Sequence, residues 1–128
     1  MRKSYIVSAK RTAIGSFLGG LATVKPKDMG SAVVKALLED ANVAPENVDE
    51  VICGNVLGAG LGQNIGRTIA LEAGIPETVC AHSVNMVCGS GLRTVMEAVM
   101  SIQCGFNDIV VAGGVESMSG APYLIPAN

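Results

Sequence analysis

Short, continuous apolar runs alternate with helical stripes along this chain, and this alternation constrains the fold more than any other feature. Residues 51–57 (VICGNVL) and 109–114 (IVVAGG) are almost wholly apolar, which is typical of strands buried on both faces. Between such runs, apolar residues recur three and four positions apart, as in amphipathic helices. The alternation predicts an α/β fold, in which right-handed crossovers build a mostly parallel mixed sheet with helices on both faces.

The hydrophobic pattern predicts seven strands and helices before residue 116. Strands are expected at 5–9, 51–57, 81–85 and 109–114, and helices from Pro26, over 65–73 and from Ser90 to the residue before Gly105. Gly74 and Pro76 are typical residues for stopping the second helix. From Glu116 onward the periodicity is lost. This end is expected to begin a loop or a further subdomain, and the chain is expected to be truncated there.

Composition excludes several classes of protein. The chain has 128 residues, 49% of them hydrophobic and 16% charged, which is enough for one domain with a core. A net charge of -2 with scattered Lys and Arg argues against nucleic-acid binding. No apolar run is long enough to cross a bilayer, and the N-terminus does not resemble a signal peptide. The four cysteines have no CxxC spacing and there is one histidine, so no metal site is expected, and free thiols favour the cytoplasm.

Cys88 is the candidate catalytic residue. It lies in SVNMVCGSGL, where a strand pattern passes directly into a helix. A thiol at a helix N-terminus loses its proton more easily, and the thiolate is the nucleophile. Gly89 and Gly91 leave room for a substrate, and the Cys88 N–H could meet an oxyanion. The alternative, an inert core cysteine, is common for cysteines in general, but this context favours the nucleophile.

Other residues receive structural interpretations. Cys53 and Cys104 are interpreted as packing residues, because neither has the helix-start context of Cys88. Ser90 departs from the G-x-S-x-G nucleophile motif and is predicted to cap the helix. His82 is interpreted as structural, because its spacing from Cys88 does not set the imidazole against the sulfur. The chain therefore offers no convincing general base.

A glycine loop at 58–62 lies between a strand and a helix, as dinucleotide-binding loops do. The expected third glycine is replaced by Gln63, and the loop follows the second predicted strand rather than the first. The loop is therefore predicted to be a tight turn, and no tightly bound cofactor is expected.

Five stretches together resemble the thiolase family. They are RTAIGSFLGGL at 11–21, VICGNVL at 51–57, GQNIGR at 62–67, VNMVCGSG at 84–91 and AGGVESMS at 112–119. The resemblance covers essentially the whole chain, and five segments in register are far more specific than any one of them. The short-chain, biosynthetic members of the family are the most similar. Gln63 and Arg67 match family positions near the dimer contact and are given structural roles only.

The resemblance implies a subunit of two similar layered α/β halves and a loop domain. Residues 1–119 would form most of the N-terminal half and 120–128 the start of the loop domain, with the C-terminal half absent from this chain. The implied reaction condenses two acetyl-CoA molecules reversibly to acetoacetyl-CoA and CoA through an acyl group on Cys88. The general bases and most CoA contacts would come from outside this chain, so the chain alone is expected to be inactive.

Two alternatives remain open at this point. A ketoacyl synthase shares the fold and the cysteine, although the first and last matched stretches favour a thiolase. A non-catalytic fragment or assembly module is the other alternative. The expected partners are coenzyme A thioesters as substrates and further protein surface, by self-association or docking on the missing half. The parent protein is expected to be a homotetramer.

Overall fold

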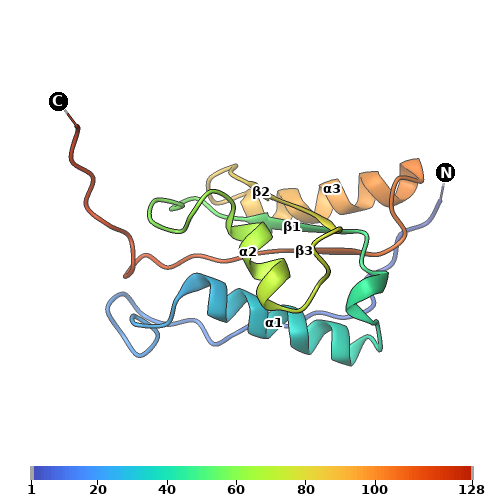
Figure 1. The fold of residues 1–128 in the computed structure, drawn as a ribbon, viewed down its shortest axis with the longest axis horizontal. Coiled ribbons are helices and arrows are strands. Elements are labelled where there is room, and N and C mark those ends of the chain that lie inside the picture. Colours follow the sequence, from blue (N-terminus) through green and yellow to red (C-terminus); the bar gives the residue numbers. More distant parts are fainter. Residues whose placement is uncertain (1, 128) are drawn as a thin grey trace.

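The computed structural model describes residues 2–127 as a three-stranded sheet between helices. The elements are α1 (Pro26–Asp40), the short 3-10 turn η1 (Pro45–Asn47), β1 (Glu50–Gly54), α2 (Ile65–Glu72), β2 (Cys80–Val84), α3 (Ser90–Cys104) and β3 (Val110–Gly114). Figure 1 shows α3 on one side of the sheet and α1 on the other. The predicted helix starts at Pro26 and Ser90 are confirmed, and α3 ends before Gly105 as predicted.

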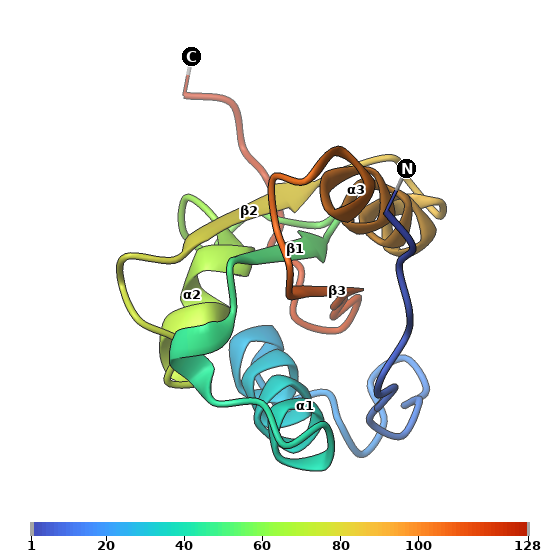
Figure 2. The same ribbon diagram turned by 90° about the vertical axis from the view of Figure 1, so that its right-hand side faces the viewer.

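The sheet has the strand order β2-β1-β3, and both strand pairs are parallel. α1 and α2 cover one face and α3 covers the other, which Figure 2 shows along the strands. The contact of Thr94 Oγ1 with the carbonyl of Gly113, at 3.1 Å, ties α3 to β3. The predicted α/β class and the helices on both faces are thus confirmed. The sheet was expected to be mixed, whereas the three strands of residues 2–127 all run in one direction.

The main core lies between the sheet and the α1–α2 layer. Its buried members are Val34, Leu38, Val48, Val51, Cys53, Ile65, Ile69, Ala70, Ala73 and Ile75. On the opposite face of the sheet, Ile52 of β1 and Thr94 and Ala98 of α3 are buried where the helix packs on the sheet. Burial of both faces explains why residues 51–53 read as a continuous apolar run rather than an alternating one.

The predicted strand at 5–9 is wrong. Tyr5, Ile6 and Val7 lie in an unpaired, largely exposed segment, which Figure 2 shows passing the sheet on the side of β3 without joining it. A cavity of about 730 Å³ lies between α1, β3 and the segment that follows β3, and it is lined in part by residues 10–17, 29–37 and 111–119. Because a strand needs a neighbour to pair its N–H and C=O groups, apolar composition alone does not make one here.

Strand ends differ slightly from the prediction. β1 stops at Gly54 rather than at Leu57, because the N–H groups of Val56 and Leu57 donate to the carboxylate of Glu116. β2 begins and ends one residue earlier than predicted, and β3 begins one residue later. The carboxyl ends of β1 and β2, at Gly54 and Val84, lie at the edge of the sheet that holds the candidate site.

Candidate active site

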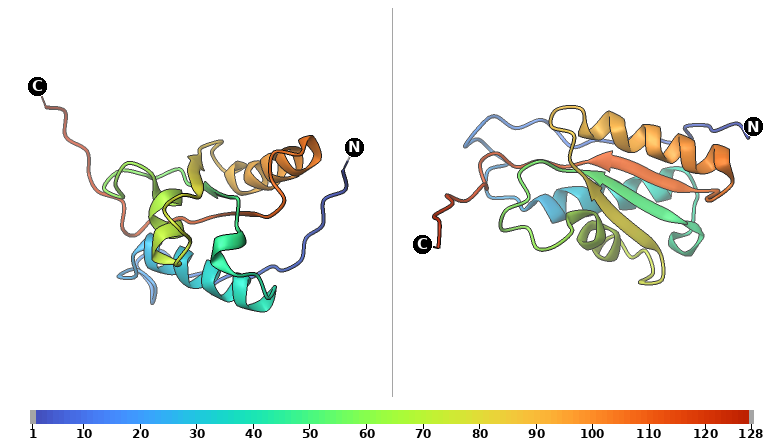
Figure 3. Two further views of the ribbon diagram at one scale, coloured as in Figure 1. Left: turned by 45° about the vertical axis from the view of Figure 1, so that its right-hand side comes forward. Right: turned by 90° about the horizontal axis from the view of Figure 1, so that it is seen from above.

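The three strands end at one edge of the sheet, and Cys88 lies in the turn that leaves this edge. Gly54, Val84 and Gly114 are the last residues of their strands and lie side by side in the register, and the arrowheads in the right-hand view of Figure 3 all point to this edge. In open parallel sheets, ligands bind outside the carboxyl ends of the strands. Cys88 is exposed and precedes the first residue of α3 by two positions.

Hydrogen bonds close the turn that carries Cys88. Gly89 N donates to the carbonyl of Met86 at 3.0 Å, and Ser90 N donates to that of Val87 at 3.1 Å. Val87 N donates to Asn85 Oδ1 at 3.0 Å. Ser90 Oγ accepts from Met86 N at 2.8 Å. These four bonds use the N–H groups of Met86, Val87, Gly89 and Ser90, and not that of Cys88.

Val87, directly before the cysteine, has a left-handed backbone with a φ of 51°. A β-branched residue in this region is a genuine outlier, and such strain costs about 1–3 kcal/mol. It persists only where the surroundings hold it, and such positions cluster at functional sites. The hydrogen bonds of the turn hold Val87 in this conformation. They fix the backbone on both sides of Cys88.

The predicted capping role of Ser90 is wrong. The N-cap of α3 is Gly89, and no side chain caps it. Ser90 is the first helical residue and is buried, so its hydroxyl points back into the turn. There it donates to the carbonyl of Val87 at 2.6 Å, in addition to accepting from Met86 N. The Ser90 hydroxyl therefore stabilises the turn before α3 instead of accepting hydrogen bonds from the N–H groups of the helix.

α3 begins almost in contact with the end of β1. A Cβ added to Gly54 would lie 2.9 Å from the carbonyl carbon of Ser90 and 3.0 Å from Gly91 N. Only glycine at this strand end lets the helix start so close to the sheet. The helix N-terminus carries partial positive charge, and this packing directs it to the strand edge where Cys88 lies. A Cβ at Gly91 would meet nothing within 4 Å, so there is open space beside the site.

The other cysteines separate into two kinds. Cys53 is buried in β1, and burial raises the pKa of its thiol from 9.0 to about 11, so it is an inert packing residue as predicted. Cys104 was expected to pack too, but it is exposed, because it ends α3 on a side turned to solvent. Cys80 is also exposed. Exposure alone does not single out Cys88, whereas its position at the start of α3 does.

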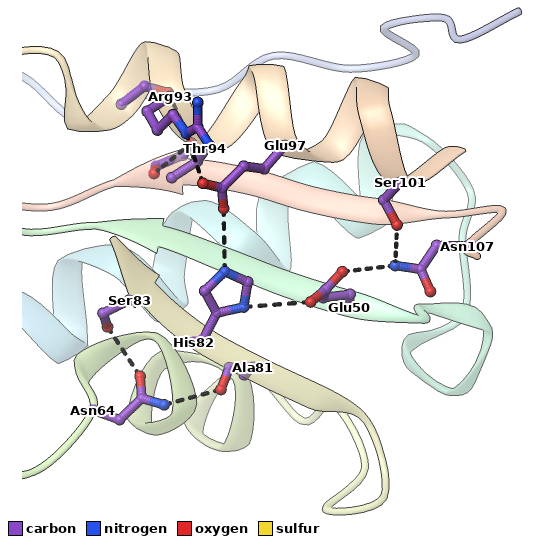
Figure 4. Close-up of polar contacts among 12 residues, drawn as sticks. Glu50, Asn64, Ala81, His82, Ser83, Arg93, Thr94, Glu97, Ser101 and Asn107 are labelled. Atoms are coloured by element: carbon purple, nitrogen blue, oxygen red, sulfur yellow. Dashed lines mark hydrogen bonds and ion pairs between the residues drawn. The ribbon is translucent and has the colours of Figure 1, made fainter. Parts of the chain in front are cut away.

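His82 lies between carboxylates on two other elements. Its Nδ1 is 3.3 Å from Glu50 Oε1 in β1, and its Nε2 is 3.3 Å from Glu97 Oε2 in α3 (Figure 4). Arg93 Nε donates to Glu97 at 2.7 Å. Hydrogen bonds from Arg93 and then His82 lower the pKa of Glu97, against the opposing effect of its partial burial. The imidazole of His82 thus lies between side chains of β1 and α3, in line with its structural interpretation.

Glu116 and Asn55 are site residues that sequence reasoning missed. Glu116 Oε1 accepts from Asn55 Nδ2 at 2.9 Å and from Leu57 N at 3.0 Å, and Oε2 accepts from Val56 N at 3.0 Å. Asn55 is buried. The signal was present in the sequence: each is a polar residue within two positions of the end of a buried strand, where it reaches the carboxyl edge.

The remaining predictions concern loops and ions. The 58–62 loop forms a turn closed by Leu61 N donating to the carbonyl of Gly58, with Gly60 and Gly62 at positive φ. Arg67 has a structural role, donating to the carbonyls of Val79 and Glu77 at 2.8 and 2.7 Å. Among the described residues, no group of three His, Cys, Asp or Glu side chains is arranged to hold a metal. No helix within 2–127 is long and apolar enough to span a membrane.

Comparisons with known proteins agree on one family. Residues 4–128 match the family model described as thiolase, N-terminal domain. The chain is 54% identical to an acetyl-CoA acetyltransferase of Escherichia coli (strain K12) over 128 residues, which is all of this chain and 32% of that protein. It is 57% identical to the cytosolic acetyl-CoA acetyltransferase of Mus musculus over 119 residues, 93% of this chain and 30% of the relative.

Among solved structures, the chain resembles a thiolase from Ascaris suum in complex with coenzyme A. The TM-score is 0.95 at 40% identity, over 97% of this chain and 32% of the other. The chain thus spans about a third of the length of the relatives that it matches.

Proposed function

Because this chain belongs to the thiolase family, as an N-terminal domain, we propose that it supplies the acyl-accepting cysteine of an acetyl-CoA C-acetyltransferase. The parent enzyme condenses two acetyl-CoA molecules to acetoacetyl-CoA and CoA, and also runs in reverse. Its substrates are coenzyme A thioesters, and no tightly bound cofactor takes part. The two relatives quoted above are both named acetyl-CoA acetyltransferase, and each is more than half identical to this chain over the matched residues. Their names support this choice of substrate.

The first half of the reaction acylates Cys88. Its sulfur attacks the carbonyl carbon of acetyl-CoA, a new C–S bond forms, and the carbonyl oxygen becomes an oxyanion. The Cys88 N–H, which the bonds of the turn leave out, is one donor for that oxyanion. When the oxyanion collapses, the bond to the CoA sulfur breaks, and the proton of the cysteine thiol leaves with CoA.

The second half transfers the acetyl group to carbon. A base removes a proton from the methyl group of a second acetyl-CoA, and the resulting carbanion attacks the carbonyl of acetyl-Cys88. The C–S bond to Cys88 breaks, acetoacetyl-CoA leaves, and the thiol regains a proton. The bases for these steps come from the part of the enzyme beyond this chain. Splitting one difficult step into two in this way is the advantage of covalent catalysis.

One observation carries this proposal. Cys88 is an exposed thiol in a strained, hydrogen-bonded turn that ends at a helix N-terminus, at the carboxyl edge of a parallel sheet. The first turn of α3, whose N–H groups carry partial positive charge, begins two residues after this thiol, and a Cβ at Gly91 would meet nothing within 4 Å. No other cysteine of the chain combines these features.

The rest of the enzyme is proposed to cover α3. Residues 1–119 then form most of the N-terminal half, and 120–128 begin the loop domain. Leu92, Met96 and Met100 lie four residues apart on α3 and are 69%, 47% and 44% exposed, which makes an apolar stripe of the kind that marks an interface. A C-terminal half is the natural occupant, since the relatives are about three times as long. The parent is proposed to be a homotetramer and to be cytoplasmic, the latter in keeping with the cytosolic relative.

Replacing single cysteines in the complete parent protein tests the proposal. With acetyl-CoA or acetoacetyl-CoA plus CoA and no carrier protein, we expect Cys88→Ala to abolish turnover. Cys104→Ala, which replaces the exposed cysteine at the far end of the helix that Cys88 precedes, is the matched control and should keep wild-type turnover. Full activity of the Cys88→Ala enzyme would defeat the proposal, and a wild-type requirement for an acyl-carrier protein would favour a ketoacyl synthase.

A further inference from the structure

The carboxylate of Glu116 joins the ends of β1 and β3 through hydrogen bonds. It follows β3 by two residues and takes N–H bonds from three residues in a row after β1, namely Asn55, Val56 and Leu57. None of the ion pairs found in residues 2–127 includes Glu116. Hydrogen-bond donors of residues 55–57 already occupy both oxygens of this half-buried carboxylate. We therefore interpret Glu116 as a residue that holds the segment after β1 in place, and not as a base that takes a proton from a substrate.

Asn55 extends this contact to the turn that carries Cys88. Its side-chain Nδ2 donates to Glu116 and, at 3.0 Å, to the carbonyl of Val115. Its backbone N–H donates to the carbonyl of Val84 at 3.0 Å. Val84 is the last residue of β2, four residues before Cys88. A single buried residue thus connects the end of β3 to the end of the strand that leads into the cysteine turn.

A second path runs through Gly54. Its carbonyl accepts from Val115 N at 3.0 Å, and its Cα packs against Ser90 and Gly91 at the start of α3. Asn55 and Glu116, which follow Gly54 and Val115 in the chain, are hydrogen-bonded to each other. The entry of the cysteine turn from β2 therefore rests on a backbone bond from Asn55, and its exit into α3 rests on packing against the neighbouring Gly54.

From this geometry we propose that Glu116 and Asn55 form a positioning pair that sets the Cys88 sulfur against the acyl carbonyl; the inference rests on the function proposed above. Neither residue is a catalytic residue, because neither touches the reacting atoms. A misplacement of 1 Å far from the chemistry can cost about a hundredfold in rate. The pair is therefore expected to govern the rate of acyl transfer to Cys88 more than the affinity for acetyl-CoA.

The test uses the complete parent enzyme and the single-turnover rate of Cys88 acetylation by acetyl-CoA. Glu116→Gln keeps the shape of the side chain but turns an N–H₂ group toward N–H donors. We expect acetylation to slow by about tenfold or more, with a much smaller change in KM. Asn55→Ala, which leaves the two backbone donors on Glu116, should slow acetylation less, and it decides the question if Glu116→Gln fails to fold.

Asp49→Asn is the matched control. Asp49 Oδ2 accepts from Asp108 N at 2.7 Å and Ile109 N at 2.9 Å, so it clamps β1 to β3 in the same way at the opposite end of the strands. This variant should lose stability to urea but acetylate at the wild-type rate. Wild-type acetylation in Glu116→Gln or Asn55→Ala, or equal slowing in all three variants, would overturn the positioning role. An active wild-type enzyme that never acetylates Cys88 would instead overturn the proposed function.

Discussion

Cys53 and Cys88 carry the same thiol group in opposite surroundings. Cys53 lies in the core of β1, where desolvation disfavours the thiolate, whereas Cys88 is exposed at the start of α3. The contrast shows which part of a cysteine's chemistry a sequence reveals. The change from a strand pattern to a helix pattern around Cys88 predicted its position, and the continuous apolar run predicted the burial of Cys53.

The two thiols should differ in alkylation. Because burial raises the pKa of Cys53 to about 11, iodoacetamide at neutral pH should leave it unmodified in the folded protein and modify it only after unfolding. Peptide mapping of the alkylated protein measures this. Cys88 in the same sample is the reference, and Cys53 reacting as fast as Cys88 in the folded state would contradict this account.

The raised pKa of Cys53 also links stability to pH. Below about pH 9 the Cys53 thiol is protonated in both the folded and the unfolded chain, so its titration does not change the free energy of unfolding. Above about pH 9 the unfolded chain loses the proton first, which favours unfolding. The free energy of unfolding should therefore fall as the pH rises from about 9 to 11. Cys53→Ala should flatten this alkaline slope in urea titrations, although it lowers stability at neutral pH. An unchanged slope would be the contrary result.

Hydrogen-bond partners at the site were harder to predict than the position of Cys88 before α3. Ser90 was assigned to the wrong backbone groups, because a sequence shows that a serine lies near a helix start but not which way its hydroxyl turns. Glu116 and Asn55 are separated by 61 positions in the chain and meet only after β1 and β3 pair. Hydrogen bonds between such distant residues leave no local pattern in a single sequence.

The elements followed the sequence wherever burial set the pattern. α1, α2 and α3 have apolar faces that the 3.6-residue period predicts, and β1 and β3 are apolar because helices cover both faces. The strand predicted at 5–9 failed because strand pairing depends on a neighbour supplied from elsewhere. The prediction that β1 runs to Leu57 failed for a related reason, because Glu116 accepts hydrogen bonds from the N–H groups that would continue the strand.

The close approach of β1 and α3 gives a prediction at this scale. In Gly54→Ala, the new methyl group would meet Ser90 at about 3 Å, so α3 must shift at its N-terminus. Such overpacking typically costs about 1–3 kcal/mol, and acylation of Cys88 in the parent enzyme should slow. Urea unfolding and the acetylation rate measure the two effects. Gly113→Ala in β3, where a Cβ meets nothing within 4 Å, is the control, and equal effects at both positions would contradict the packing argument.

At the scale of the whole molecule, the three-layer arrangement leaves α3 half covered. The sheet protects one side of the helix, while Leu92, Met96 and Met100 face outward. The chain is about a third as long as its relatives. Packing against the rest of the enzyme would explain why this apolar stripe is exposed here. The 128 residues alone should then show no measurable thiolysis, because the proposed bases lie elsewhere.

The stripe should also make the isolated 128-residue protein self-associate. Met96→Lys places a charge in its centre and should shift the protein toward the monomer in analytical ultracentrifugation. Leu71→Lys in α2 is the matched control, since Leu71 is 45% exposed on the opposite side of the sheet, against 47% for Met96. Association that both substitutions weaken equally, or that neither changes, would show that α3 is not the contact surface.

The most direct measurement is the site of acetylation in the complete parent enzyme. After brief mixing with labelled acetyl-CoA and an acid quench, digestion and mass spectrometry should find the acetyl group on the peptide that contains Cys88, bound to its sulfur. Addition of CoA before the quench should remove the label, since the step is reversible. An active enzyme whose acetyl group sits on another residue, or that forms no acetyl-enzyme at all, would contradict the central claim.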